Sequence, residues 1–132
     1  AGMAKGATSM ALHYAMERKT FGKAIAEHQA IQLKLAEMST RAVAAELLVH
    51  QAANKFDRHE RCDLEAGQAK FFASEAAVQN SLDAMRVFGG YSYSPEYEIE
   101  RFYRDAPLLC IGEGTNEIQR MIIAKQMVAR AS

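Results

Sequence analysis

The feature that most constrains the fold is a run of apolar residues that recur at alternating steps of four and three. This spacing places them on one face of a single helix of about eight turns beginning near residue 28. The members are Ile31, Leu35, Met38, Ala42, Ala45, Val49, Ala52 and Phe56. Small residues occupy the middle of the run, so a neighbouring helix can approach closely there. A long helix with one apolar face must pack against other helices, which predicts a helical bundle.

Helical patterns also precede and follow this segment. Met3, Ala7, Met10 and Tyr14 share a helical face, and we expect that first helix to end near Glu17. Residues 18–27 lack a sustained pattern and are predicted to be a connection. Residues 57–63 are rich in charge and read as a turn. Asp63 is a candidate N-cap for the next helix, with an apolar stripe that comprises Leu64, Phe71, Val78, Leu82 and Met85, widened by Phe72 and Ala76.

Turn residues divide the remainder of the chain. Gly89 and Gly90 are expected to stop the preceding helix. Ser94 and Pro95 then predict the N-cap and first residue of a short helix, which Pro107 should end because proline disfavours helical geometry in the residue before it. No segment alternates as a strand would. The predicted fold class is therefore all-α, most simply one domain with an antiparallel bundle of four or five helices.

Composition excludes several classes of partner. Lysine plus arginine equals aspartate plus glutamate at 16 each, so no basic surplus exists to bind nucleic acid or an anionic membrane. No apolar run approaches the ~20 residues that span a bilayer. Cys62 and Cys110 lie far apart and predict reduced thiols, typical of the cytoplasm, or of the mitochondrial matrix if the source is eukaryotic. The chain begins inside a helical pattern, so we expect it to be part of a longer protein.

Metal chemistry is not expected. Helical bundles that hold two iron ions use Glu-x-x-His pairs on facing helices, and the nearest candidate, Glu46 with His50, is one residue too long. The four histidines, His13, His28, His50 and His59, are therefore predicted to be surface or partly buried side chains rather than ligands.

The most informative motif is Gly112-Glu113-Gly114-Thr115. Glycines permit positive φ and let a flat, bulky group approach the backbone, while Thr115 is a candidate N-cap for a last helix. A carboxylate can act as a general base near neutral pH if its pKa is raised, and burial can raise it by up to 3–5 units. A helix N-terminus opposes this by only about 0.3–1 kcal/mol. Glu113 is thus a candidate base, and the alternative is an exposed glutamate in a polar turn.

Three motifs, in order and spacing, resemble the C-terminal helical domain of the acyl-CoA dehydrogenase family. They are Arg18-Lys19-Thr20-Phe21-Gly22 with Gln29, Gly89-Gly90-Tyr91, and Gly112-Glu113-Gly114-Thr115, and the resemblance covers essentially the whole chain. It implies an FAD-dependent oxidoreductase of fatty acid metabolism, in which Glu113 takes the α-proton of an acyl-CoA thioester while a hydride leaves the β-carbon for the flavin. It also implies N-terminal and middle domains outside this chain.

The resemblance further implies residues that contact cofactor or substrate. Arg18, Thr20 and Gln29 match positions that reach across a subunit interface to the FAD diphosphate, so a homodimer or homotetramer is expected. An electron-transfer flavoprotein-like acceptor is implied as a partner. Further cofactor positions are Arg86, Gly89, Gly90, Thr115, Asn116 and Glu117, and Gly114 matches a substrate position.

The chain departs from the family pattern at two positions, and several motifs have alternative interpretations. Family members commonly have glutamine at the position of Arg86, and several have tyrosine at that of Gly112. Arg18 and its neighbours could instead form a solvated loop, and Gly89-Gly90 an ordinary helix C-cap. Arg104-Asp105 is read as a structural ion pair. For the whole chain, the alternatives are a non-catalytic helical oligomerisation module and a related acyl-CoA oxidase or reductase.

Overall fold

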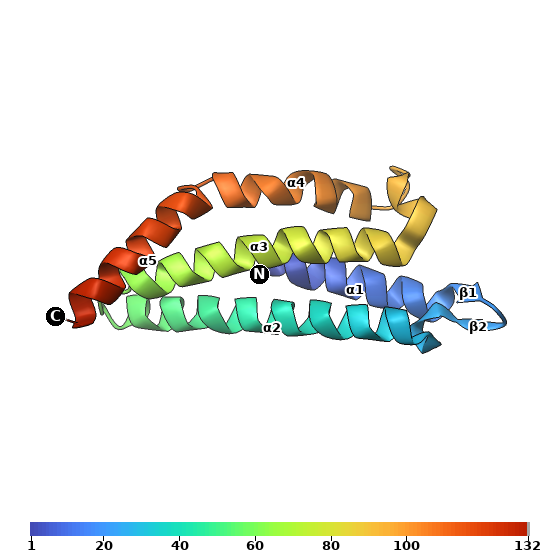
Figure 1. Cartoon of the computed structure of the whole chain (residues 1–132), viewed down its shortest axis with the longest axis horizontal. Coiled ribbons are helices and arrows are strands. Elements are labelled where there is room, and N and C mark those ends of the chain that lie inside the picture. The colour runs from blue at the N-terminus through green and yellow to red at the C-terminus, as the bar shows by residue number, and fades with distance from the viewer. Residues whose placement is uncertain (132) are drawn as a thin grey trace.

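The computed structural model describes residues 1–131, which form five α-helices and one short hairpin (Figure 1). In chain order the elements are α1 (Gly2–Glu17), β1 (Lys19–Thr20), β2 (Lys23–Ala24), the 3-10 helix η1 (Ile25–Glu27), α2 (Gln29–Asp57), α3 (Asp63–Phe88), the 3-10 helix η2 (Gly89–Tyr93), α4 (Ile99–Ile111) and α5 (Asn116–Ala131). The predicted all-α bundle is confirmed. The hairpin, in which Thr20 pairs with Lys23, was not predicted.

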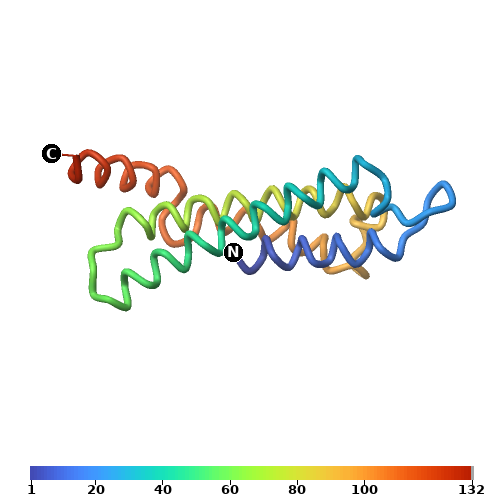
Figure 2. Tube along the Cα trace, turned by 90° about the horizontal axis from the view of Figure 1, so that it is seen from below, coloured from blue at the N-terminus to red at the C-terminus, as the bar shows by residue number. Residues whose placement is uncertain are grey.

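Helix α3 is the central element, with α1, α2, α4 and α5 all packed against it. Helix α2 runs antiparallel to α3 along most of its length, α1 lies against both, and α4 returns along another side of α3 (Figure 1). Helix α5 leaves the end of α4 and lies beside the first turns of α3 (Figures 1 and 2). None of the helices formed by residues 1–131 is both long enough and apolar enough to cross a membrane.

The interior is built mainly from small side chains. Helix α1 buries Ala4, Ala7, Ala11 and Ala15, each with no exposed surface. Because four helices surround α3, its closest contacts also need small residues. The predicted stripe on α3 is therefore only partly right: Ala76 is buried, but the large members are only partly buried, and the other buried residues include Ala69, Ala73, Ala77 and Ala84.

One buried amide joins three helices. The Asn80 side-chain nitrogen on α3 donates to the Ala4 carbonyl of α1 at 3.2 Å and to the Met38 carbonyl of α2 at 2.8 Å. Its side-chain oxygen accepts from the Arg41 Nε atom at 2.7 Å. Asn80 has no exposed surface, so these bonds are made away from water and fix how the three helices sit against one another.

Three predicted helix boundaries differ from the structure. Cys62, not Asp63, is the N-cap of α3, and Asp63 is the first helical residue. Ser94 and Pro95 lie in the turn before α4, which begins only at Ile99. Pro107 does not end α4 but lies inside it. Ala106, before the proline, is fully buried, so packing holds it in helical geometry against its local preference.

Candidate functional site

The predicted site residues gather at two separate places on the bundle. One group lies beside the hairpin and the end of α3, and the other at the turn between α4 and α5 (Figure 1). Val87 lines a cavity in the first group and Ser74 a cavity in the second. Thirteen helical positions between them correspond to roughly 20 Å along α3. The chain therefore presents two sites rather than one.

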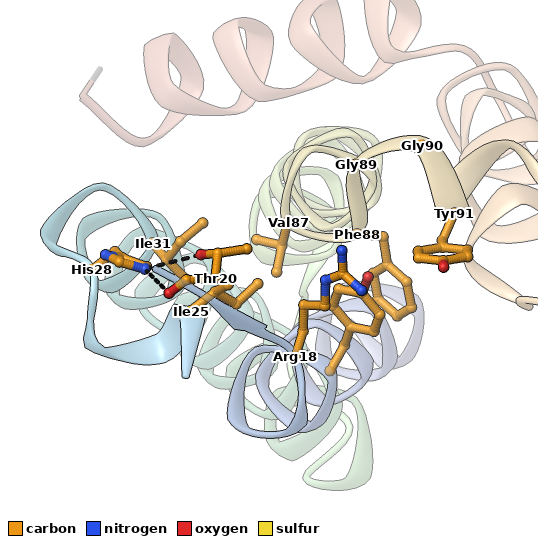
Figure 3. A pocket seen from close by; sticks show the side chains of 11 residues that line it. Arg18, Thr20, Ile25, His28, Ile31, Val87, Phe88, Gly89, Gly90 and Tyr91 are labelled. Carbon is orange, nitrogen blue, oxygen red and sulfur yellow. Dashed lines mark hydrogen bonds between the residues drawn. The ribbon is translucent and has the colours of Figure 1, made fainter. Parts of the chain in front are cut away.

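The hairpin cavity has a volume of about 630 Å³, within the range of small-molecule sites (Figure 3). Its walls are largely apolar, with a few polar groups: the Arg18 guanidinium, the Thr20 hydroxyl and the His28 imidazole. The lining residues are Tyr14, Arg18, Thr20, Ile25, His28, Ile31, Val87, Phe88, Gly89, Gly90 and Tyr91. Four predicted cofactor residues are thus brought together from segments about 70 positions apart in the chain, Arg18 and Thr20 with Gly89 and Gly90.

The hairpin positions Thr20 and its neighbours. Phe21 and Gly22, at φ values of 52° and 82°, form a two-residue turn with both residues in the left-handed region. The turn returns the chain to η1, and His28 then comes beside Thr20, with 3.0 Å between the Thr20 hydroxyl and the His28 Nε2 atom (Figure 3). Phe21, at the tip, is 98% exposed.

Aromatic rings form one wall of the hairpin cavity. The rings of Tyr14 and Phe88 stack with 4.2 Å between their centroids. Burial raises the pKa of the Tyr14 hydroxyl, although the nearby charge of Arg18 acts against this. The Arg18 guanidinium lies 5.6 Å from the ring centroid of Tyr91 and makes no ion pair within the described residues. This cation remains available to an anionic ligand.

Gly89 and Gly90 lie both at the end of α3 and in the lining of the hairpin cavity. Gly89, with φ at 62°, is the C-cap of α3, so the predicted end of this helix is confirmed. Both glycines also line the cavity, and a Cβ atom placed on Gly90 would meet nothing within 4 Å. Their backbone therefore faces open space that a ligand can occupy.

Two other predicted cofactor residues lie outside this lining. Gln29 is exposed in the first turn of α2. Arg86 is exposed near the end of α3 and donates to Asp83 at 3.0 Å. The largely buried Asp83 carboxylate also pairs with Arg41 of α2. The Arg86 side chain is thus already part of an ion-pair group on the bundle.

The second site is the turn between α4 and α5. Glu113 and Gly114 have φ values of 56° and 84°, an uncommon conformation for glutamate. The φ of Gly114 is one that other residues rarely adopt, so the turn fits glycine there. The Thr115 hydroxyl accepts from the Ile118 backbone N–H at 3.4 Å, which confirms the predicted N-cap.

Glu113 lines a second cavity, of about 470 Å³. The other lining residues are mostly apolar or small and come from α3 and α4: Ala1, Lys70, Ala73, Ser74, Leu108, Leu109 and Gly112. Glu113 itself is exposed to solvent. The arrangement places one carboxylate at an opening into an apolar cavity, where it can remove a proton from a bound molecule.

The residues that follow Glu113 differ in their surroundings. Glu117 is exposed, and hydrogen bonds from its own backbone N–H and from the Thr115 hydroxyl lower its pKa. Asn116, in contrast, is only 2% exposed. Its side-chain oxygen accepts from Lys70 at 2.7 Å and Ser74 at 3.0 Å. The Asn116 side chain thus bonds inside the chain, which leaves its backbone for any ligand.

Sequence reasoning missed His28 and Lys70. His28 follows the predicted connection and precedes Gln29, a position that gave no signal of its own. Lys70 stands in an otherwise alanine-rich segment of α3, and a lone cation there is a signal that could have been recognised. Within the described residues, no group of three or more histidine, cysteine, aspartate or glutamate side chains is arranged to hold a metal ion.

Comparison with known proteins gives matches to one family along almost the whole chain. A family model described as the C-terminal domain of acyl-CoA dehydrogenase matches residues 1–128. The chain is 50% identical to an acyl-CoA dehydrogenase of Bacillus subtilis, over 96% of this chain and 34% of that protein. It is 43% identical to the caffeyl-CoA reductase-Etf complex subunit CarC of Acetobacterium woodii, over 98% of this chain and 34% of that one.

Solved structures agree. Butyryl-CoA dehydrogenase from Megasphaera elsdenii superposes with a TM-score of 0.94 at 38% identity, over 96% of this chain and 33% of that one. The chain thus spans about a third of the length of the relatives that it matches.

Proposed function

Since the chain belongs to the acyl-CoA dehydrogenase family, as its C-terminal helical domain, we propose that it supplies the base and part of the FAD site of an acyl-CoA dehydrogenase. The observation that carries this proposal is the turn of Glu113: a carboxylate on left-handed backbone, between glycines, at the opening of an apolar cavity of about 470 Å³. The remaining contacts to flavin and thioester belong to N-terminal and middle domains. Alone, the chain is inactive.

The proposed reaction removes hydrogen from two neighbouring carbons of an acyl-CoA thioester. A carboxylate oxygen of Glu113 accepts the α-proton, which the adjacent thioester carbonyl makes acidic. FAD, when bound, accepts the hydride that leaves the β-carbon, so a double bond forms between the two carbons. The exposed Glu113 becomes a stronger base when substrate and the other domains exclude water from it. The apolar lining residues, such as Leu108 and Leu109, suit an acyl group.

We propose that the hairpin cavity holds the diphosphate region of FAD. The unpaired Arg18 guanidinium can donate two hydrogen bonds to phosphate oxygens, and the Thr20 hydroxyl, which is hydrogen-bonded to His28, adds a polar group beside it. Gly89 and Gly90 let the cofactor approach their backbone. Gln29 and Arg86 would contact it only from outside the cavity.

The separation of the two sites supports a shared arrangement between subunits. The hairpin cavity would hold the cofactor of a neighbouring subunit, while Thr115, Asn116 and Glu117 lie near the flavin that serves Glu113. Roughly 20 Å of helix between the sites is consistent with this. The functional unit would then be a homodimer or homotetramer, because neither FAD site is complete in one copy.

The relative from Acetobacterium woodii favours one partner and one second candidate function. Its name places it in a complex with Etf, which supports an electron-transfer flavoprotein as the acceptor here. The same name describes a caffeyl-CoA reductase. A reductase uses the same two transfers in reverse, with Glu113 returning the proton. Assays of the complete enzyme with a saturated and an unsaturated acyl-CoA, each with its electron partner, distinguish the two directions.

The test is Glu113→Gln in the complete enzyme, a change that keeps size and hydrogen bonding but removes the basic oxygen. Flavin should stay bound, and its reduction by acyl-CoA should fall by at least ~10²–10⁴-fold. Exchange of the α-hydrogen with solvent should fall in parallel, because it needs the base but not hydride transfer. Glu96→Gln is the matched control, since Glu96 is exposed and forms no ion pair within the described residues.

Two results would contradict the proposal. Reduction at near the original rate in Glu113→Gln would mean that the base lies elsewhere in the enzyme. A complete protein that binds no flavin and acts on no acyl-CoA would instead support the non-catalytic oligomerisation module.

A further inference from the structure

A single lysine holds both ends of the turn that carries Glu113. The Lys70 ammonium group donates to the Cys110 carbonyl, in the last turn of α4, at 3.2 Å. It also donates to the Asn116 side-chain oxygen, at the start of α5, at 2.7 Å. These two acceptors stand on either side of residues 112–115. We propose that Lys70 is a positioning residue that fixes the location of Glu113, an inference that rests on the proposed function of that glutamate.

The acceptor on α5 is itself firmly held. The Ser74 hydroxyl donates to the same Asn116 oxygen at 3.0 Å, and the Asn116 nitrogen donates to Glu75 at 2.8 Å. Lys70, Ser74 and Glu75 all lie on α3, so the first residue of α5 is attached to the central helix at three points. With its side chain 2% exposed, Asn116 cannot turn away to water.

The charge of Lys70 suits its place at the end of α4. The last carbonyls of a helix lack backbone donors and carry partial negative charge, so an ammonium group there is favourable. The N-terminus of α5 carries partial positive charge. There the ammonium group donates to the side-chain oxygen of Asn116 rather than to a backbone group of the helix. One cation can therefore connect two helix ends of opposite sign. A neutral side chain would lose the charge-assisted part of both bonds.

The position of the Glu113 carboxylate depends on its surroundings because the turn that carries it is strained. Glu113 and Gly114 adopt left-handed backbone, and for a glutamate this conformation persists only where the surroundings enforce it. A general base also has to sit correctly against the proton that it takes, and a displacement of about 1 Å can cost ~100-fold in rate. Without Lys70, the ends of α4 and α5 could separate and the Glu113 carboxylate would leave that position.

The experiment compares three variants of the complete enzyme. Lys70→Met keeps an apolar stem and removes the ammonium group. At saturating acyl-CoA we expect flavin reduction to slow by roughly 10- to 100-fold, with α-hydrogen exchange slowed in parallel. The flavin spectrum should stay unchanged, because Lys70 is not among the proposed flavin contacts. The dissociation constant of acyl-CoA should change less than the rate, because Lys70 is only one of the residues that line the acyl cavity. Lys55→Met is the control, since Lys55 is another partly buried lysine, bonded to a buried carboxylate at 2.7 Å, and should keep the rate.

The outcomes separate this inference from the proposed function. If Glu113→Gln is inactive and Lys70→Met reduces flavin at the original rate, Lys70 has no positioning role. If Lys55→Met is slowed as much as Lys70→Met, the effect is general loss of stability, and the inference is wrong. If Glu113→Gln keeps its rate, the proposed function itself fails. Should Lys70→Met not fold, Ser74→Ala, which removes one donor to Asn116, should give a smaller decrease in the same two rates, and an unchanged rate would refute the inference.

Discussion

Acid should destabilise this chain through one buried carboxylate, Glu65, which ties three helices together. Glu65 lies on α3 and is 5% exposed. Arg130, near the end of α5, donates two hydrogen bonds to it, at 2.7 Å and 3.0 Å. Lys55, near the end of α2, donates a third at 2.7 Å. The bonds from Arg130 and then Lys55 lower the pKa of Glu65 to about 2, although burial acts in the opposite direction.

The sign and size of the effect follow from this pKa. A carboxylate whose pKa is lowered by folding adds stability that is fully present above its unfolded pKa of 4.5 and is lost as pH falls toward about 2. A difference of roughly 2.5 units corresponds to about 3 kcal/mol in the free energy of unfolding. By about pH 3.5 the same relation removes about 1.4 kcal/mol of that stabilisation.

The assay is denaturant unfolding of the chain, followed by far-ultraviolet circular dichroism, at about pH 6.5 and about pH 3.5. Other acidic groups titrate too, so the useful quantity is the stability difference between the natural chain and Glu65→Gln. That difference should shrink by about 1.4 kcal/mol between the two pH values. Glu60→Gln is the control, because Glu60 forms an exposed pair with Arg58 and should change stability by less than about 1 kcal/mol. A difference for Glu65→Gln that is the same at both pH values would refute the reasoning.

Two further predictions concern the chain on its own. It should fold as a helical bundle but bind FAD weakly or not at all, because one copy offers only part of the cofactor surface; purification as a yellow protein with one flavin per chain would show the opposite. It should also self-associate, since Leu33, Val43 and Leu47 of α2 are 61%, 53% and 64% exposed. Sedimentation at increasing concentration measures this, and a strict monomer throughout would argue against it.

The sequence was most informative for a helix that packs against the rest of the bundle with a single face. The long stripe on α2 predicted a helix from about residue 28 to 56, and the structure has it at Gln29–Asp57. Met38, Ala42 and Ala45, in the middle of the stripe, are buried, while Phe56 near its end is 71% exposed. Periodicity thus identified the helix and its inner face, but not how much of α2 the neighbouring helices cover.

Prediction failed where tertiary contacts determine which residues are buried and where a helix ends. On α3, neighbours on several sides remove the contrast between an apolar and a polar face, so large residues such as Phe71 could not be told from the true interior positions. Pro107 was expected to end a helix, and only the packing of Ala106 explains why it does not. Lys70 was a recognisable lone cation among alanines, but its two partners could not be identified, because they lie 40 and 46 positions away in the chain.

For the candidate site, motifs identified members but not their grouping. Arg18, Thr20, Gly89 and Gly90 were predicted individually, and the structure shows that they line one cavity. Their spacing in the sequence did not indicate that Glu113 would lie at a different cavity. The distance between two residues in a bundle depends on the direction of each helix between them. The assignment of each residue to flavin or substrate stays a prediction.

The alanine interior makes side-chain volume the main limit on substitution. Ala7, Ala11 and Ala77 are fully enclosed where helices meet at close range, so even an apolar exchange for a larger residue finds no space there. A valine or leucine there would force helix axes apart, at a typical cost of 1–3 kcal/mol. Hydrophobicity is therefore a poor guide to tolerance in this bundle. Variation among natural homologues should be limited by side-chain volume inside the bundle, while its larger outer side chains are free to change with whatever they meet.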